Sequence, residues 1–272
     1  MEAGRIAVIG AGKMGETLIR AMVATDTFPR EHILATAKTP ERLEQLGRDL
    51  GIATTLDNRE AVSGAETVLL CVKPQGAEEV LHGIGDALGP DKLLISILAG
   101  IPTADLEAAV PKGVPVVRAM PNTPALVEAG MTALCRGRHA EERHVASARR
   151  IFAAVGRTVT LDEKHFDAVT GLSASGPAFL YIVIEALAEG GVKVGLPRSV
   201  ATELAAQTCL GAAKMVIETG EHPAVLKDAV TTPAGCTVDG ILKLEEGGLR
   251  VTLIKAIVEA AGRARGLGKT PS

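Results

Sequence analysis

Apolar and polar positions alternate along the first half of the chain with two different periods. Short β-branched and aliphatic runs with the period of a strand are followed by longer stretches with the 3.6-residue period of an amphipathic helix. The pattern predicts strands at 5–9, 33–37, 67–72, 93–98, 114–119, 131–135 and 158–161, and helices at 14–24, 40–50, 75–88, 103–110 and 140–155. Successive strand and helix units indicate an α/β fold of Rossmann type, a doubly wound and mainly parallel sheet with helices on both faces.

From residue 164 onward the strand signals stop and only helical periods follow. They predict helices at 165–172, 176–190, 198–218, 224–230, 234–245 and 249–266. We therefore expect a dinucleotide-binding domain at 1–162 and an all-helical domain at 163–272. The helix at 176–190 is apolar nearly all round, and a domain of this size has little interior in which to bury it. This mismatch predicts a subunit interface, and hence a homo-oligomer.

Charge and composition narrow the classes of partner. A formal net charge of -3 gives no basic field for nucleic acid or an anionic membrane, and aromatic residues make up only 2% of the chain. No apolar run approaches the roughly 20 residues of a membrane span, and the N-terminus does not resemble a signal peptide. The four cysteines are scattered, which favours free thiols and a cytoplasmic protein. The histidines show no zinc-binding spacing, so we expect no metal site and a small-molecule ligand.

The segment that follows the first strand carries the clearest chemical signal. It reads Gly10-Ala11-Gly12-Lys13-Met14-Gly15 and opens a helix. In the dinucleotide fingerprint the first glycine permits a tight turn, the second lets the backbone approach a pyrophosphate, and the positive end of the helix faces that charge.

The end of the second strand indicates which dinucleotide binds. NAD-binding units place an acidic residue there, about 20 residues after the glycines, to hold the ribose hydroxyls. Here the segment reads Ala35-Thr36-Ala37-Lys38, without an acid. Thr36, Lys38 and Arg42 are candidate donors to a 2′-phosphate, which favours NADP; the alternative for Lys38 is an ordinary solvated lysine.

Two segments of the helical domain are candidate ligand sites. Ser175 precedes Gly176-Pro177, either as a helix cap or as a ligand residue. In the segment 230–237, Thr232 is the expected N-cap and Pro233 the first helical residue, so free N–H groups would lie around 234–237. Such a helix end can bind a small carboxylate.

Several motifs taken together resemble the pyrroline-5-carboxylate reductase family. They are VIGAGKMG at 8–15, CVKPQ at 71–75, SILAGI at 96–101, RAMPNTPA at 118–125, TGLSASGPAF at 170–179, GVKVGLPR at 191–198 and KDAVTTPAGCT at 227–237. The resemblance implies NAD(P)H-dependent reduction of the cyclic imine 1-pyrroline-5-carboxylate to L-proline, the last step of proline biosynthesis. It also implies intertwined homodimers built through the helical domain, often five dimers in a ring.

The same resemblance implies roles for individual residues. The cofactor-contacting positions are Ile9, Gly10, Ala11, Gly12, Lys13, Met14, Thr36, Lys38, Asn58, Cys71, Val72, Lys73, Pro74, Ile97, Leu98 and Ala99. The substrate-binding positions are Ser175, Val230, Thr231, Thr232, Gly235, Cys236 and Thr237. Thr237 matches a position beside the imine nitrogen, so it is the predicted catalytic residue; the alternative is a hydroxyl that only caps a helix.

The chain departs from the family pattern inside the substrate loop. Ala234 and Cys236 stand where the pattern has Gly and Thr or Ala. The alanine is harmless in a helical conformation, but a positive φ would make it a strained replacement.

Two other function classes share parts of this pattern. A 3-hydroxyacid dehydrogenase would have a similar fold, but it should carry a catalytic lysine in the helical domain, and 173–178 contains none. A non-catalytic dinucleotide sensor would keep the fingerprint without a shaped substrate loop.

Overall fold

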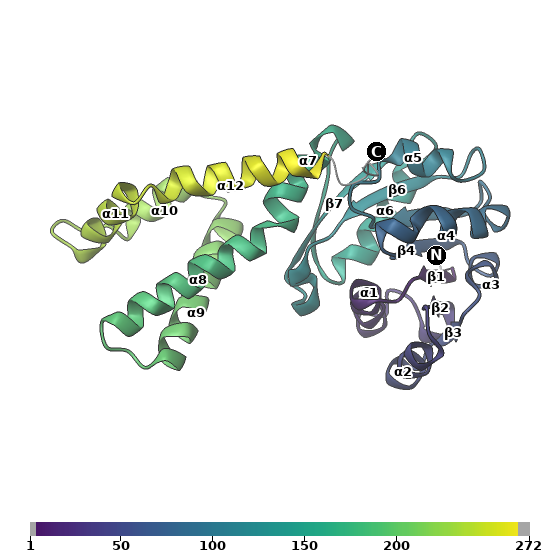
Figure 1. Ribbon diagram of the computed structural model, residues 1–272, viewed down its shortest axis with the longest axis horizontal. Helices are drawn as coiled ribbons and strands as arrows, with labels where there is room; N and C mark the ends of the chain where they lie inside the picture. Colours follow the sequence, from purple (N-terminus) through teal and green to yellow (C-terminus); the bar gives the residue numbers. More distant parts are fainter. Residues whose placement is uncertain (1–3, 266–272) are drawn as a thin grey trace. The chain divides into compact units, whose positions relative to one another are not determined.

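The computed structural model describes residues 4–265, which form two compact units (Figure 1). The first unit contains the sheet and its helices up to Ala174, together with the end of the last helix from Ala260. The second unit is helical and runs from Ser175 to Glu259.

The first unit is built on an eight-stranded sheet in the order β3-β2-β1-β4-β5-β6-β7-β8. The strands are β1 (Ile6–Ile9), β2 (Ile33–Thr36), β3 (Ala53–Thr55), β4 (Thr67–Leu70), β5 (Leu93–Ser96), β6 (Val116–Met120), β7 (Gly130–Arg136) and β8 (Gly156–Thr160). All neighbouring pairs are parallel except β6 and β7. The order reverses between β1 and β4, as in dinucleotide-binding folds. The predicted fold class is confirmed.

Helices cover both faces of the sheet and bury its apolar side chains. On one face α1 (Lys13–Ala24), α2 (Pro40–Leu50) and α6 (Glu142–Ala153) contribute to a core that includes Leu18, Leu46 and Phe152. On the other face α3 (Asn58–Ser63), α4 (Ala77–Ile84) and α5 (Thr103–Ala108) contribute to a second core, which includes Val62 and Leu81. Strand residues such as Val8 and Ile9 alternate between the two cores because side chains point to opposite faces of a sheet.

The first unit extends beyond the predicted domain boundary near residue 162. The 3-10 turn η5 (Glu163–His165) and α7 (Phe166–Val169) stay attached to the sheet, and a π-helical turn, η6 (Thr170–Ala174), follows them. Glu163 accepts hydrogen bonds from the Thr103 N–H at 2.7 Å, the Thr103 hydroxyl at 2.6 Å and Arg118 Nη1 at 2.8 Å. The Arg118 guanidinium also lies 4.7 Å from the centre of the buried Phe166 ring. These contacts hold the linker to β6 and to the start of α5.

The second unit consists of α8 (Gly176–Lys193), α9 (Arg198–Thr219), α10 (Pro223–Ala229), α11 (Cys236–Glu246) and most of α12 (Leu249–Ala264). α8 and α9 pack through small residues, Ala188, Ala201 and Ala205. Many large apolar side chains stay exposed, among them Tyr181 at 61% and Ile182 at 64%. Exposed apolar surface of this extent marks an interaction site.

The helical run Glu163–Lys193 is long and apolar enough to cross a membrane when length and composition alone are considered. Its most apolar window has a mean hydropathy of 1.4, and only 11% of that window is buried within the chain. The exposed apolar side chains of this run therefore require contact with another protein chain or with lipid.

Candidate functional site

The predicted cofactor residues gather at one edge of the sheet, at the carboxyl ends of five neighbouring strands. β3, β2, β1, β4 and β5 are adjacent in that order and all parallel. The residues that end or directly follow them are Ile9 to Met14 after β1, Thr36 and Lys38 after β2, Asn58 after β3, Cys71 to Pro74 after β4, and Ile97 to Ala99 after β5. Ligands of open parallel sheets bind outside these ends, at the point where strand order reverses.

The glycine-rich turn has the geometry that the fingerprint requires. Gly10 has φ +85°, and a Cβ placed there would lie 2.7 Å from Val72 Cγ1 and 3.1 Å from its backbone. A Cβ on Gly12 would meet nothing within 4 Å, so the backbone is open above the start of α1. This open approach next to a helix N-terminus fits the pyrophosphate of a dinucleotide.

Thr36 lies inside the turn and not at its surface. It is 1% exposed, its hydroxyl oxygen accepts the Gly10 N–H at 3.1 Å, and its carbonyl accepts the Ala11 N–H at 2.6 Å. Thr36 therefore holds the turn against β2. Lys38 is exposed one residue beyond Ala37, and this leaves it available to a phosphate.

The third candidate donor, Arg42, faces the turn. Its Nε donates to the Ala11 carbonyl at 3.2 Å, and its Nη2 forms an ion pair with Glu16 on α1. Burial by itself raises the pKa of Glu16, but hydrogen bonds from Arg42 and Arg20 outweigh it and hold that pKa below its ordinary value. The carboxylate is therefore charged at neutral pH.

The remaining strand ends are shaped by local backbone contacts. Lys73 is exposed and directly precedes the 3-10 turn η2 (Pro74–Gly76). In the segment after β5, the Leu98 N–H donates to the Ser96 hydroxyl at 3.3 Å. Burial raises the pKa of the Cys71 thiol, which is therefore neutral and unreactive near pH 7.

Asn122 is a residue whose function the sequence did not show. Its Oδ1 accepts the Met131 N–H at 2.9 Å, and its Nδ2 donates to the Ser173 carbonyl at 3.2 Å. The side chain joins the start of β7 to the π-helical turn, a type of turn frequent at functional sites. Pro121 and Pro124, which flank this position, are typical of a rigid turn, but they do not indicate this contact.

The substrate loop differs from the predicted cap. Thr232 was expected as the N-cap and Pro233 as the first helical residue; instead Gly235 is the N-cap and α11 begins at Cys236. The Gly235 N–H donates to the Thr232 carbonyl at 3.0 Å, which makes 232–235 a β-turn. The Pro at its second position and the positive φ at its third are typical of a type II turn. The helix therefore begins three residues later than predicted, and the N–H groups of its first residues, Cys236 and Thr237, lie at the end of the predicted range 234–237.

Ala234 occupies the third position of this turn and has φ +57°. The conformation is left-handed, so the harmless helical alternative does not hold. A Cβ on Gly235 would lie 2.5 Å from the Thr232 hydroxyl oxygen. The half-buried Thr237 is the second residue of α11, on the segment where helical N–H groups lack helical acceptors.

Ser175 does not cap a helix with its side chain. Its backbone is helical, with φ -86° and ψ -28°, and its side chain makes no capping hydrogen bond. The π-helical turn leads directly into α8, so no break exists here that a cap would serve. The capping alternative is wrong, whereas the ligand role of Ser175 stays a prediction.

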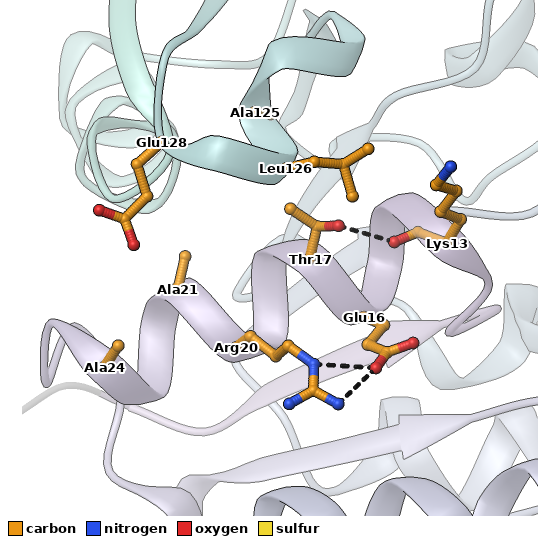
Figure 2. Close-up of a pocket in the computed structure, with 9 residues that line it drawn as sticks. All are labelled: Lys13, Glu16, Thr17, Arg20, Ala21, Ala24, Ala125, Leu126 and Glu128. Atoms are coloured by element: carbon orange, nitrogen blue, oxygen red, sulfur yellow. Dashed lines mark hydrogen bonds and ion pairs between the residues drawn. The ribbon is translucent and has the colours of Figure 1, made fainter. Parts of the chain in front are cut away.

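A pocket of about 420 Å³ lies beside the start of α1 (Figure 2). Its walls come from α1 and from the 3-10 turn η4 (Thr123–Val127) with Glu128. Figure 2 shows Lys13 next to Leu126, while Glu16 and Arg20 pair with each other on α1. Of the predicted cofactor residues, the pocket wall contains Lys13.

Known proteins resemble the chain over its full length. A pyrroline-5-carboxylate reductase from Methanosarcina acetivorans is 44% identical over 269 residues, which cover 99% of this chain and 100% of the relative. The chain belongs to the pyrroline-5-carboxylate reductase family. The solved structure of a pyrroline-5-carboxylate reductase from Coxiella burnetii matches 98% of this chain and 100% of its own, with a TM-score of 0.93 and 35% identity.

Family models and a second structure describe the two parts of this reductase-family chain. Residues 163–267 match the family "Pyrroline-5-carboxylate reductase dimerisation", which contains the whole apolar run through α8. Residues 5–100 match "NADP oxidoreductase coenzyme F420-dependent", so the first unit carries an NADP-binding domain. The Plasmodium falciparum pyrroline carboxylate reductase was solved with NADP bound; it is 29% identical and matches 99% of this chain and 100% of its own, with a TM-score of 0.87.

Proposed function

We propose that this chain reduces 1-pyrroline-5-carboxylate to L-proline with NADPH, in the last step of proline biosynthesis. The full-length match to the pyrroline-5-carboxylate reductase family carries the proposal, and the strand-end array and the substrate loop of this chain support it. The array supplies a place for a dinucleotide, and the start of α11 supplies N–H groups for a small anion.

The residues of the first unit would bind and orient the cofactor. NADPH, when bound, supplies a hydride to the imine carbon. The open backbone at Gly12 and the N-terminus of α1 face the pyrophosphate, because Gly10 lets the chain turn tightly beside Val72. Ile97, Leu98 and Ala99 directly follow β5, where this segment would lie against the flat nicotinamide ring.

The residues of the substrate loop would hold the imine. The N–H groups of Cys236 and Thr237 begin α11 and offer donors to the substrate carboxylate, and the helix dipole favours the negative charge. The Thr237 hydroxyl would orient the ring nitrogen, which already carries a proton when the carbon receives the hydride; the amine that forms then takes its second proton from solvent. A protonated imine is already electrophilic, so positioning supplies most of the catalysis and a strong protein acid is unnecessary.

We further propose that the enzyme prefers NADPH to NADH. The end of β2 offers no carboxylate to a ribose, while the exposed Lys38 offers a charged donor to a 2′-phosphate. The exposed apolar faces of α8 and α9 and the match to a dimerisation family support a homodimer. The ring of five dimers that the family resemblance implies is part of the proposal. The four cysteines are free thiols, which supports a cytoplasmic location.

An initial-rate assay separates this function from its alternatives. We expect NADPH oxidation with 1-pyrroline-5-carboxylate and none with a 3-oxoacid. Turnover of the 3-oxoacid alone would indicate a hydroxyacid dehydrogenase. NADPH binding without turnover of either compound would indicate a dinucleotide sensor.

A further inference from the structure

The guanidinium of Arg42 lies on the side of α2 that faces the dinucleotide turn, and it contacts three different groups. Its Nε donates to the Ala11 carbonyl at 3.2 Å and its Nη1 to Gln45 Oε1 at 3.1 Å, while Nη2 pairs with Glu16. Only about a quarter of the Arg42 side chain is exposed. The fork of an arginine is rigid and planar, so these bonds also fix its orientation.

Together with Thr36, the Arg42 contact to Ala11 holds three backbone groups of the turn. The Gly10 N–H, the Ala11 N–H and the Ala11 carbonyl are bonded by the Thr36 hydroxyl, the Thr36 carbonyl and Arg42 respectively. Gly12 follows directly, and it is the residue whose backbone is open to a ligand. A displacement of Ala11 would therefore move the backbone that meets the pyrophosphate.

Rotation of the Arg42 guanidinium away from the turn, toward a 2′-phosphate, would disrupt this arrangement. Turning the guanidinium away from the turn would break its bond to Ala11 and its pair with Glu16, which is itself only 20% exposed. Glu16 would keep Arg20, at 2.7 Å, but the Ala11 carbonyl would lose its side-chain donor. Leaving the Ala11 carbonyl without this donor costs free energy, so the observed bonds favour the orientation of Arg42 toward the turn.

We propose that Arg42 is a positioning residue that fixes the phosphate-binding turn for both nicotinamide dinucleotides and does not read the 2′-phosphate. The proposal rests on the proposed NADP(H)-dependent function. It leaves Lys38 as the charged residue that distinguishes NADPH from NADH. The two residues stand four positions apart on the same segment, so each serves as the control for the other.

Dissociation constants measured on the purified full chain test the proposal. For Arg42→Gln we expect the constants for NADPH and NADH to rise by a similar factor, about tenfold to a hundredfold, which corresponds to a lost charged hydrogen bond. Adenosine 2′-monophosphate carries the 2′-phosphate without a pyrophosphate, so its binding should not change. Lys38→Ala should weaken the binding of adenosine 2′-monophosphate and of NADPH, but not the binding of NADH.

The proposal would be overturned if Arg42→Gln raised the dissociation constants for NADPH and adenosine 2′-monophosphate but not the constant for NADH. A lower melting temperature with all three constants unchanged would also overturn it, because the residue would then only stabilise the fold. Should Arg42→Gln fail to fold, Arg42→Lys keeps the charge beside Glu16 and should show the same pattern more weakly. A wild-type chain that binds neither dinucleotide would refute the proposed function, and that result is visible before any variant is made.

Discussion

Ala234 carries a backbone conformation that ordinarily belongs to glycine. Its φ of +57° places the backbone of Ala234 in the left-handed region, and the residue occupies the third position of the turn before α11. Such a conformation costs an L-residue roughly 1–2 kcal/mol. The sequence of the loop alone does not distinguish this left-handed conformation from a harmless helical one, because the same residues are compatible with both.

Ala234→Gly should therefore stabilise the protein. Relief of the strain should raise the free energy of unfolding by about 1 kcal/mol. The greater backbone entropy of glycine in the unfolded state should offset part of that gain. Chemical denaturation measures the change. Ala146→Gly, on the exposed face of α6, is the matched control and should lower stability by about 1 kcal/mol. Equal losses in both variants would show that residue 234 does not need a positive φ.

Substitution of Thr237 tests whether its hydroxyl has a catalytic or a structural role. If the hydroxyl orients the imine nitrogen, Thr237→Ala should lower kcat by about 10- to 1000-fold and leave the melting temperature nearly unchanged. The prediction of a capping role is weakened by the position of Thr237 inside α11, since Gly235 is the N-cap. Full turnover in a less stable variant would remove Thr237 from the mechanism.

At the scale of elements, Glu163 links α5, β6 and the segment that leads to α7. Burial by itself raises the pKa of Glu163, but the hydrogen bonds from Thr103 and Arg118 outweigh it and hold the pKa below its ordinary value of 4.5. The contribution of Glu163 to stability is therefore present above the unfolded pKa and is lost as the pH falls through the lower, folded pKa. Burial, together with the charge of the same carboxylate, raises the pKa of Cys135 to about 12.

Glu163→Gln should lower stability at pH 7 by about 1–3 kcal/mol, because it leaves the buried Arg118 without its counterion. The difference from the wild type should begin to shrink as the pH falls below 4.5, the ordinary pKa, and should disappear below the lower folded pKa, where the native carboxylate is neutral as well. Glu142→Gln, in the exposed pair with Arg149, is the control and should cost less than about 1 kcal/mol. A loss independent of pH would show that the charge of Glu163 contributes nothing.

Most elements of the first unit could be predicted from period alone, but β3 and α3 could not. Ala53–Thr55 is a three-residue edge strand with an exposed first residue, so it has no apolar alternation to detect. α3 is only six residues long, although Asp57 caps it by accepting from the N–H groups of Arg59 and Glu60. The cofactor residues implied by the family resemblance lie at strand ends and stay predictions, whereas the role proposed for Arg42 depends on a contact between α2 and the turn that no local pattern encodes.

At the scale of the whole molecule, the apolar surface of the second unit requires a partner. Ile182 lies on α8 with 64% of its surface exposed, within the part of the chain that matches the family dimerisation model. Ile182→Asp should yield an inactive monomer or an aggregate, because a carboxylate in an apolar interface is not paired. Light scattering with an activity assay tests this. A monomeric variant with full activity would contradict the interface.

The transfer of hydride to the imine carbon is the central claim, and one isotope experiment tests it. The purified chain is incubated with 1-pyrroline-5-carboxylate and with NADPH that carries deuterium at its transferable position, and the product is examined by mass spectrometry and chiral chromatography. We predict L-proline with one deuterium, on the ring carbon across the nitrogen from the carbon that bears the carboxylate, and one molecule formed for each NADPH oxidised. Proline without deuterium, or NADPH oxidation without proline, would contradict the account.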